Sequence, residues 1–515
     1  MKAAIWAGAL ALALIQATAA ANAQVITKQY DDGGVYEGTF RNGRQHGQGS
    51  YSLPNGFRYE GDWVEGAIQG QGTATYPNGS VYVGQFDQGK PNGQGKITYA
   101  DGGTYEGNWE EGEMSGEGVA KYASGSTYTG TFAKGLHQGK GVLTQADGFR
   151  YEGDWVAGVK EGHAKITYPD GSTYEGGMLA GQRAGKGKLT LADGMVYDGV
   201  WAAGQMSGTG VLIYASGEKY EGALRNGRRE GKGITTYVNG DIYNGDFVND
   251  RPHGQGKLTM TDGYIYEGEW AEGNRQGQGK ITFPGGAVYV GPVKAGRPDG
   301  QGKITYADGS TYEGNWTAGE IVGQGKARYA NGLFYEGSFK GARIEGQGRM
   351  TYPDGFVYSG AWRDGKRHGQ GQATYPDGMV YTGNYVDDVR EGKGKLTAPD
   401  GFIYDGEWKA GEMDGTGIAT YASGDRYEGQ LKAGKRQGQG VMHYATGEVA
   451  SGDWNNDALV KDDTASGAAE RALVEGENVG GANDTQNVAP QLPADQSTPE
   501  TEASAADPEA EPAAP

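Results

Sequence analysis

Hydrophobic and polar residues alternate along this protein in short runs joined by turn residues. In the segment 312–334, residues 312–317 alternate between apolar or glycine positions and polar ones, which is the period-2 pattern of a strand. A polar, glycine-containing stretch at 318–323 is expected to form a turn, and the alternation resumes over 325–329. The Asn-Gly pair at 331–332 then predicts a second turn, because glycine adopts positive φ without steric cost. The segment therefore predicts one β-hairpin.

This hairpin pattern recurs every 23 residues without insertion or deletion. Tyrosine begins each of 18 copies, from Tyr36 to Tyr427, and a partial nineteenth runs from Ala450 to Trp454. Counting that tyrosine as position 1, glycine fills positions 3, 12 and 21 in every copy, and position 14 in every copy except at Ala164. Position 8 is glycine except at Asp250, Ala342 and Asp388. Constant register predicts that every hairpin contacts the next in the same way.

The alternation also assigns the faces of the predicted sheet. Positions 1, 3 and 5 share one face, and odd-even counting places positions 12, 14, 16 and 18 on the same side, while the other face is polar. Rings on the first face are expected to lie on the bare backbone of the glycines and to bury apolar area without a second layer. The aromatic row is either packing alone or also a partner-binding groove. Its candidate residues are Tyr59, Trp63, Tyr105, Trp109, Tyr151, Trp155, Tyr266, Trp270, Tyr312, Trp316, Tyr358, Trp362, Tyr404 and Trp408.

The expected fold is all-β, an elongated single-layer antiparallel sheet of stacked β-hairpins, followed by a disordered C-terminal tail. We divide the sequence into a signal peptide (1–23), an N-terminal lead-in (24–35), repeats 1–9 (36–242), repeats 10–18 with the partial repeat 19 (243–454), and an acidic disordered tail (455–515). Repeats 1–9 resemble repeats 10–18 at an offset of nine periods, so the array is expected to have grown by duplication of whole blocks.

The two ends of the sequence differ from the array. Lys2, an apolar run and the small residues before Gln24 are typical of a secretory signal cleaved after Ala23, which predicts a secreted or periplasmic protein. An uncleaved anchor is the alternative, but the apolar run is shorter than a bilayer span. From residue 455 onward, 13 acidic residues face two basic ones with no aromatic residue, a composition that favours disorder.

Composition excludes several kinds of chemistry. The protein has 98 glycines, no cysteine and a net charge of −19, so disulfides, thiolate sites and binding to nucleic acid are not expected. His46, His253 and His368 all occupy position 11 but lie on repeats 1, 10 and 15, too far apart to form one site. One aspartate per turn supplies too few oxygens for Ca²⁺. We therefore expect no catalytic, cofactor or metal residues.

The repeat unit Tyr-Glu-Gly-x-Trp, followed by paired glycines and Tyr-x-Asp-Gly, resembles the MORN repeat (membrane occupation and recognition nexus). Residues 266–270, 358–378 and the His-Gly-Gln-Gly sequence at 368–371 are close to that pattern. The resemblance covers the whole array and implies a single-layer sheet of stacked hairpins that serves as a rod, a scaffold or a partner-binding groove.

We expect a non-enzymatic, exported repeat scaffold that binds a protein or a cell-envelope component through its aromatic face or its open strand edges. Its oligomeric state stays open. The first alternative is a peripheral membrane protein, as the family name suggests, although the negative charge gives no attraction to anionic lipid. The second alternative is an envelope protein that binds or acts on glycans, but no repeat departs sharply enough from the pattern to provide a cleft.

Overall fold

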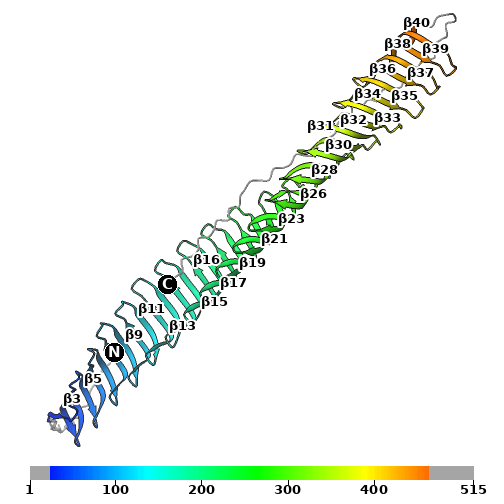
Figure 1. The fold of residues 1–515 in the computed structure, drawn as a ribbon. Coiled ribbons are helices and arrows are strands. Elements are labelled where there is room, and N and C mark those ends of the chain that lie inside the picture. Colours follow the sequence, from blue (N-terminus) through cyan, green and yellow to red (C-terminus); the bar gives the residue numbers. More distant parts are fainter. Residues whose placement is uncertain (1–23, 463–515) are drawn as a thin grey trace, which may run out of the picture. The chain divides into compact units, whose positions relative to one another are not determined.

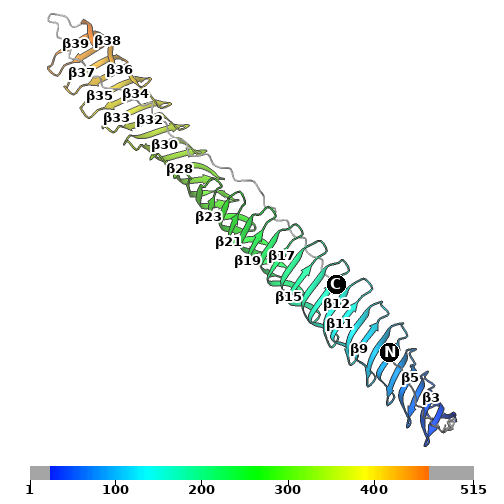
Figure 2. The ribbon, with the colours of Figure 1, turned by 180° about the vertical axis from the view of Figure 1, so that it is seen from behind.

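The computed structural model describes residues 24–462, all in strands and short turns with no helix in that range. Forty strands form one open antiparallel sheet in which contacts join strands that follow one another in sequence. Two compact units are distinguished within it, one of residues 24–215 and 224–227 and the other of residues 216–223 and 228–462. In each unit the strands lie side by side in a single layer (Figures 1 and 2), so the predicted fold class is confirmed.

Strands before the division are β1 (Ile26–Gln29), β2 (Val35–Arg41), β3 (Arg44–Ser52), β4 (Arg58–Val64), β5 (Ala67–Thr75), β6 (Val81–Asp87), β7 (Lys90–Thr98), β8 (Thr104–Glu110), β9 (Glu113–Lys121), β10 (Thr127–Ala133), β11 (Leu136–Thr144), β12 (Arg150–Val156), β13 (Val159–Thr167), β14 (Thr173–Leu179), β15 (Gln182–Thr190), β16 (Val196–Ala202) and β17 (Gln205–Ile213). The division falls within β18 (Lys219–Arg225).

The remaining strands are β19 (Arg228–Thr236), β20 (Ile242–Val248), β21 (Arg251–Thr259), β22 (Ile265–Ala271), β23 (Asn274–Thr282), β24 (Val288–Lys294), β25 (Arg297–Pro298), β26 (Gly300–Thr305), β27 (Thr311–Thr317), β28 (Glu320–Arg328), β29 (Phe334–Lys340), β30 (Arg343–Thr351), β31 (Val357–Arg363), β32 (Lys366–Thr374), β33 (Val380–Val386), β34 (Val389–Thr397), β35 (Ile403–Lys409), β36 (Glu412–Thr420), β37 (Arg426–Lys432), β38 (Lys435–His443), β39 (Val449–Asn455) and β40 (Ala458–Asp462).

The hairpin turn is shorter than the sequence predicts. Instead of a turn over 318–323, only Ala318 and Gly319 connect β27 to β28, with φ of 50° and 93°. Positive φ at both central residues is typical of the tight type I′ hairpin turn, whose twist matches that of the strands. Ala318 is not the Asn or Asp that usually indicates such a turn. The sequence pattern therefore did not predict that the second strand begins at Glu320.

A bulge interrupts the strand pairing in the middle of the hairpins. In repeat 13, Gly314 pairs with Gly325 and Trp316 with Ile321, so three residues on β28 oppose the single Asn315 on β27. The position-12 glycine lies in this bulge at a φ of 67° (Gly323), a conformation that glycine adopts at no steric cost. Position 10 is thereby paired with position 5 and faces the same side as the aromatic residues.

Tyrosine rings lie flat on the glycines, as the sequence predicts. A Cβ added to Gly325 would come within 2.4 Å of the Tyr312 ring. The Tyr312 hydroxyl donates to the carbonyl oxygen of Asn315 at 3.2 Å, and the same bond over three residues recurs along the array. Tyr312 is 0% exposed, so the ring fills the place of the side chains that glycine lacks.

The rings also join each hairpin to its neighbours. Tyr312 packs edge-to-face on Trp316 of its own repeat and on Phe339 of the next, with ring centroids 5.6 and 5.0 Å apart. The Trp316 Nε1 donates to the carbonyl oxygen of Gly302 in the preceding repeat at 3.3 Å. On the polar face, cross-strand ion pairs such as Lys326–Glu336 at 3.1 Å link the same neighbours, though exposed pairs of this kind contribute little.

The ends of the array differ from the expected boundaries. The lead-in contains β1, which pairs with β2 as the second strand of each repeat pairs with the next repeat. Repeat 19 does not stop at Trp454, because β40 pairs with β39 and extends the array to Asp462. The tail boundary at 455 is therefore wrong. The expected signal peptide (1–23) and the expected disordered tail from residue 463 onward lie outside the described residues.

Candidate functional site: the aromatic row and the hairpin tips

The aromatic row is packed inside the array. Its seven tyrosines are 0–1% exposed and its seven tryptophans 3–8% exposed. These residues are Tyr59, Trp63, Tyr105, Trp109, Tyr151, Trp155, Tyr266, Trp270, Tyr312, Trp316, Tyr358, Trp362, Tyr404 and Trp408. Each ring presents its faces to glycines and to other rings. This burial favours the packing interpretation of the row over a partner-binding groove.

Basic side chains at position 10 of the repeat take part in this ring packing. This role was not predicted from the sequence. The guanidinium carbon of Arg390 lies 5.6 Å from the ring centroid of Tyr381 in its own repeat and 4.4 Å from Trp408 in the next. Arg367 is 0% exposed and lies against three rings in the same way. Such contacts stabilise a desolvated cation by about 2 kcal/mol. The recurrence of basic residues at position 10 of the repeat was the sequence feature that could have indicated these contacts.

The aspartates that replace glycine at position 8 have a structural cause. Asp388 follows Arg367 by 21 residues, and its Oδ1 accepts from the backbone N of Arg367 at 2.9 Å and from its Nε at 3.1 Å. Asp457 holds Arg436 in the same way. The third such pair is Arg229 with Asp250, joined through the backbone N of Arg229 at 2.7 Å. An aspartate at position 8 thus pairs with an arginine of the preceding repeat.

The hairpin tips of repeats 5–7 carry four exposed apolar side chains in a row. Leu136, Val156, Val159 and Leu179 lie on the consecutive strands β11–β14 and are 48%, 52%, 43% and 63% exposed. They occupy positions 6 and 9, where Val156 pairs directly with Val159. We call these four residues the apolar tip row. Exposed apolar residues on consecutive strands make this row a candidate interaction site.

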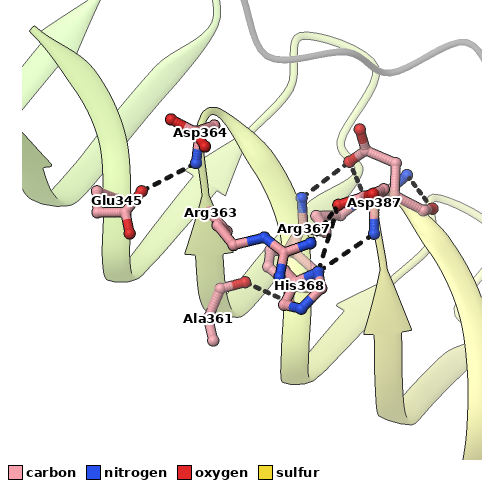
Figure 3. A network of polar contacts seen from close by, with 9 residues as sticks. Glu345, Ala361, Arg363, Asp364, Arg367, His368 and Asp387 are labelled. Carbon is pink, nitrogen blue, oxygen red and sulfur yellow. Dashed lines mark hydrogen bonds and ion pairs between the residues drawn. The ribbon is translucent and has the colours of Figure 1, made fainter.

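The duplicated half of the array is charged at three of these four places, and Val386 takes the place of Leu179. Adding the offset of 207 residues replaces Leu136, Val156 and Val159 by Arg343, Arg363 and Lys366. Figure 3 shows this region, in which Arg363 bonds to Asp387 at 3.0 Å. Arg343 and Arg363 form ion pairs there, so the hairpin itself does not require apolar residues at these three positions.

Acidic residues lie next to the apolar tip row on the side of repeat 4. Glu110 and Glu113 are paired across the tip of β8 and β9, and both are exposed together with Glu111. Lys90 bridges to Glu111 at 2.9 Å, which leaves the first two carboxylates unneutralised by any ion pair within the described residues. The surface thus changes from acidic to apolar within one repeat.

No constellation for metal or catalytic chemistry is found within residues 24–462. No group of three or more His, Asp or Glu residues could hold a metal ion there. His46 and His368 each lie near a carboxylate of the adjoining turn, Glu65 at 3.9 Å and Asp387 at 3.4 Å. The same range of residues has no helix long and apolar enough to cross a membrane.

One histidine is half-buried in the ring packing next to Leu136 of the apolar tip row. His137, at position 10 of repeat 5, stacks on Tyr128 with centroids 3.6 Å apart and contacts the Trp155 ring edge-on. Its Nε2 lies 2.8 Å from the hydroxyl of Tyr122. Burial disfavours the charged imidazole and lowers the pKa of His137 to about 4.

Acidification is therefore expected to weaken repeats 5 and 6. Below a pH of about 6.5 the unfolded protein binds a proton at His137 that the folded array rejects until about pH 4, so stability falls over this interval by about 2 kcal/mol. Hydrogen exchange of residues 128–167 at several pH values measures this loss. His137→Ile, which copies Ile344 of the duplicated half, should remove the slope; an equal slope in that variant would contradict the role of His137.

No curated protein sequence matches this one. Among solved structures, the protein is similar to the SAS-4 (dCPAP) TCP domain of Drosophila melanogaster in complex with a proline-rich motif of Ana2, at 18% identity over 30% of this sequence and 85% of that one, with a TM-score of 0.21. It is also similar to the TCP10 domain of Danio rerio CPAP in complex with a STIL peptide, at 14% identity over 53% of this sequence and 98% of that one, with a TM-score of 0.16.

The family profile of the MORN repeat matches 18 consecutive segments, the first at residues 36–58 and the last at 427–449. Their starts coincide with the tyrosines that begin each hairpin. The protein therefore belongs to the MORN-repeat family.

Proposed function

We propose that this protein is a non-enzymatic, exported scaffold that binds a protein partner in the cell envelope through the apolar tip row. The observation that carries the proposal is the exposure of Leu136, Val156, Val159 and Leu179 where the duplicated half has mainly charged residues. Exposing adjacent apolar side chains to water is unfavourable, and the fold accepts Arg or Lys at these places. An occupied binding surface accounts for their presence.

An amphipathic helix fits this surface better than other partners. Neighbouring strands lie about 4.8 Å apart and one turn of a helix rises about 5.4 Å, so a helix lying across the strands places one apolar residue over each of them. Glu110 and Glu113 beside the row favour a Lys or Arg at that end of the helix. The same acidic residues disfavour an anionic membrane surface.

Export rests on residues 1–23, whose charged start, apolar run and small residues fit a cleaved signal. N-terminal sequencing of the protein recovered from its source cell is expected to begin at Gln24. If the protein retains Met1 and is found in the cytoplasm, the proposed location in the envelope is wrong. The binding surface is then tested separately.

The binding surface is tested with a variant that copies the duplicated half. The full-length protein with Leu136→Arg, Val156→Arg and Val159→Lys should fold, because those residues occupy the equivalent tips. A partner retained by the wild-type protein from solubilised envelope is identified and titrated in purified form. We expect the variant to bind it at least about 10-fold more weakly, since removal of central apolar contacts costs about 1–2 kcal/mol or more.

The matched control is Val64→Arg, which places a charge at position 6 of repeat 2, outside the apolar tip row. It should leave the affinity unchanged. The converse variant, with Arg343→Leu, Arg363→Val and Lys366→Val, should create a second binding site. Equal affinity of the wild-type protein and the charged variant would refute the proposal. If the wild-type protein binds anionic vesicles, and the charged variant loses this binding while Val64→Arg keeps it, the membrane alternative would be favoured.

A further inference from the structure

Three arginines of the array are held by an aspartate in one recurring arrangement. In each case the arginine at position 10 lies among rings, and a carboxylate from position 8 of the next repeat accepts from its backbone N. Asp250, Asp388 and Asp457 provide that carboxylate from turns at positive φ of 68°, 76° and 70°. The array thus contains the same binding position for a carboxylate three times.

Arg390 has the same surroundings without the carboxylate. It is 4% exposed and lies over Tyr381 and Trp408, but position 8 of the next repeat is Gly411. Within residues 24–462 its Nε has no hydrogen-bond partner, and no carboxylate forms an ion pair with its guanidinium. A buried cation without a counter-charge is strongly destabilising, so this site favours the binding of an anion.

The space for a carboxylate at Arg390 is open. Gly411 has a φ of 88°, close to the 76° of Asp388, so the turn follows the same course. A Cβ placed on Gly411 would meet only Val389, at an ordinary contact distance of 3.8 Å. In the filled repeats the aspartate side chains are 15–36% exposed. A carboxylate from solution can therefore reach the same place from the surface.

The duplicated half preserves the site. Arg183 lies 207 residues before Arg390, its guanidinium carbon is 4.1 Å from the Trp201 ring centroid, and position 8 of the next repeat is Gly204. No ion pair to Arg183 is found among the residues that the structure describes either. Arg183 is half-buried, so it offers a more open version of the site.

We propose that Arg390, and Arg183 in the first half, bind a carboxylate supplied from outside the array, which takes the place that Asp388 fills beside Arg367. The guanidinium and the backbone N of Arg390 donate to one carboxylate oxygen, while Trp408 stacks beneath the cation. The side-chain carboxylate of Asp or Glu and the C-terminal carboxylate of a polypeptide share this chemistry. The proposal goes beyond the proposed function and does not depend on the apolar tip row.

The site is tested by NMR of the full-length protein labelled with ¹⁵N-arginine. Acetate is titrated against chloride at equal ionic strength, and the Nε–H resonance of Arg390 is assigned by its loss in Arg390→Lys. We expect this resonance to shift and saturate with acetate, whereas Arg367, already paired, does not respond. Absence of a saturable shift at both Arg390 and Arg183, in the wild-type protein and also after the acidic tail has been neutralised, would overturn the proposal.

Gly411→Asp should fill the site from within the protein. We expect this variant to lose the acetate response at Arg390 and to require more denaturant for the unfolding of repeats 16 and 17. Gly365→Asp places an aspartate at the same turn position above Ile344 and should give no such stabilisation. An acetate response that persists unchanged in Gly411→Asp would show that acetate binds elsewhere, which also overturns the proposal.

A further arm distinguishes the sources of the carboxylate. The acidic residues after 462 are replaced by Asn or Gln in the otherwise complete protein. If the tail of the same molecule occupies the site, the Arg390 resonance of the wild-type protein lies at its bound position and moves when the tail is neutralised. If it does not move, and acetate still binds, the carboxylate comes from another molecule.

Discussion

Replacement of Asp388 by glycine is expected to destabilise repeats 15 and 16 by about 3 kcal/mol, although glycine occupies this turn position in all but three of the 18 complete repeats. The change removes the acceptor for the backbone N and the Nε of Arg367. Arg367 is 0% exposed and lies among rings, so its buried charge loses this carboxylate. Hydrogen exchange of residues 358–397 measures the effect locally, as an array of repeats unfolds in parts.

A double variant separates the ion pair from the turn. Arg367→Ile with Asp388→Gly copies Ile344 and Gly365 of the preceding repeats and should restore most of the protection, since removal of both partners is nearly neutral. Asp364→Asn is the surface control: Asp364 pairs with Arg343 at 3.4 Å, but both side chains are more than half exposed. If Asp388→Gly costs no more than this control, the buried pair does not hold the two repeats together.

Alanine at Gly314 is expected to have an equally large effect, more than about 3 kcal/mol. Its Cβ would lie 2.6 Å from the Cα of Gly325 and 2.4 Å from the Tyr312 hydroxyl, and the backbone of the paired strand cannot move away. The φ of Gly314 is not in the left-handed region, so the effect is steric. We expect hydrogen exchange of residues 311–328 to increase while residues 404–443 stay protected.

Gly325→Ala is the informative comparison. There the three atoms nearest to the new Cβ all belong to the Tyr312 side chain, which can tilt. Ala164 occupies the equivalent position in repeat 6, where the Tyr151 hydroxyl still donates to the carbonyl oxygen of Asp154 at 2.7 Å. A cost of about 1 kcal/mol is expected. Equal costs at the two glycines would mean that the tyrosine ring is as immobile as the backbone.

The sequence was sufficient for the fold because the same local signals are repeated in register. Tyr312 and the glycines around it predict that a ring lies on bare backbone, and the structure confirms this contact. The hairpin unit was also predicted correctly. Its turn was not, because Ala318 adopts positive φ without the side chain that usually indicates such a conformation.

The error in the turn explains what was missed in the candidate site. With residues 318–323 assigned to a turn, Ile321 and the arginines at position 10 were not considered as strand residues that face the rings. The apolar tip row was missed for a similar reason, since Val156 and Val159 flank a turn whose length was wrong. The aromatic row was named as a candidate because alternation identifies a face but not whether that face is covered.

The main contacts in this sheet join strands that are neighbours along the sequence, and the tyrosine ring on its glycines recurs in every complete hairpin. Removal or insertion of a whole 23-residue unit therefore keeps the pairing register of the sheet, except where it would separate an arginine from its aspartate, as at Arg367 and Asp388. The number of hairpins can thus change while the strand pairing is preserved. Length in this protein is accordingly a quantity that evolution can adjust in single steps.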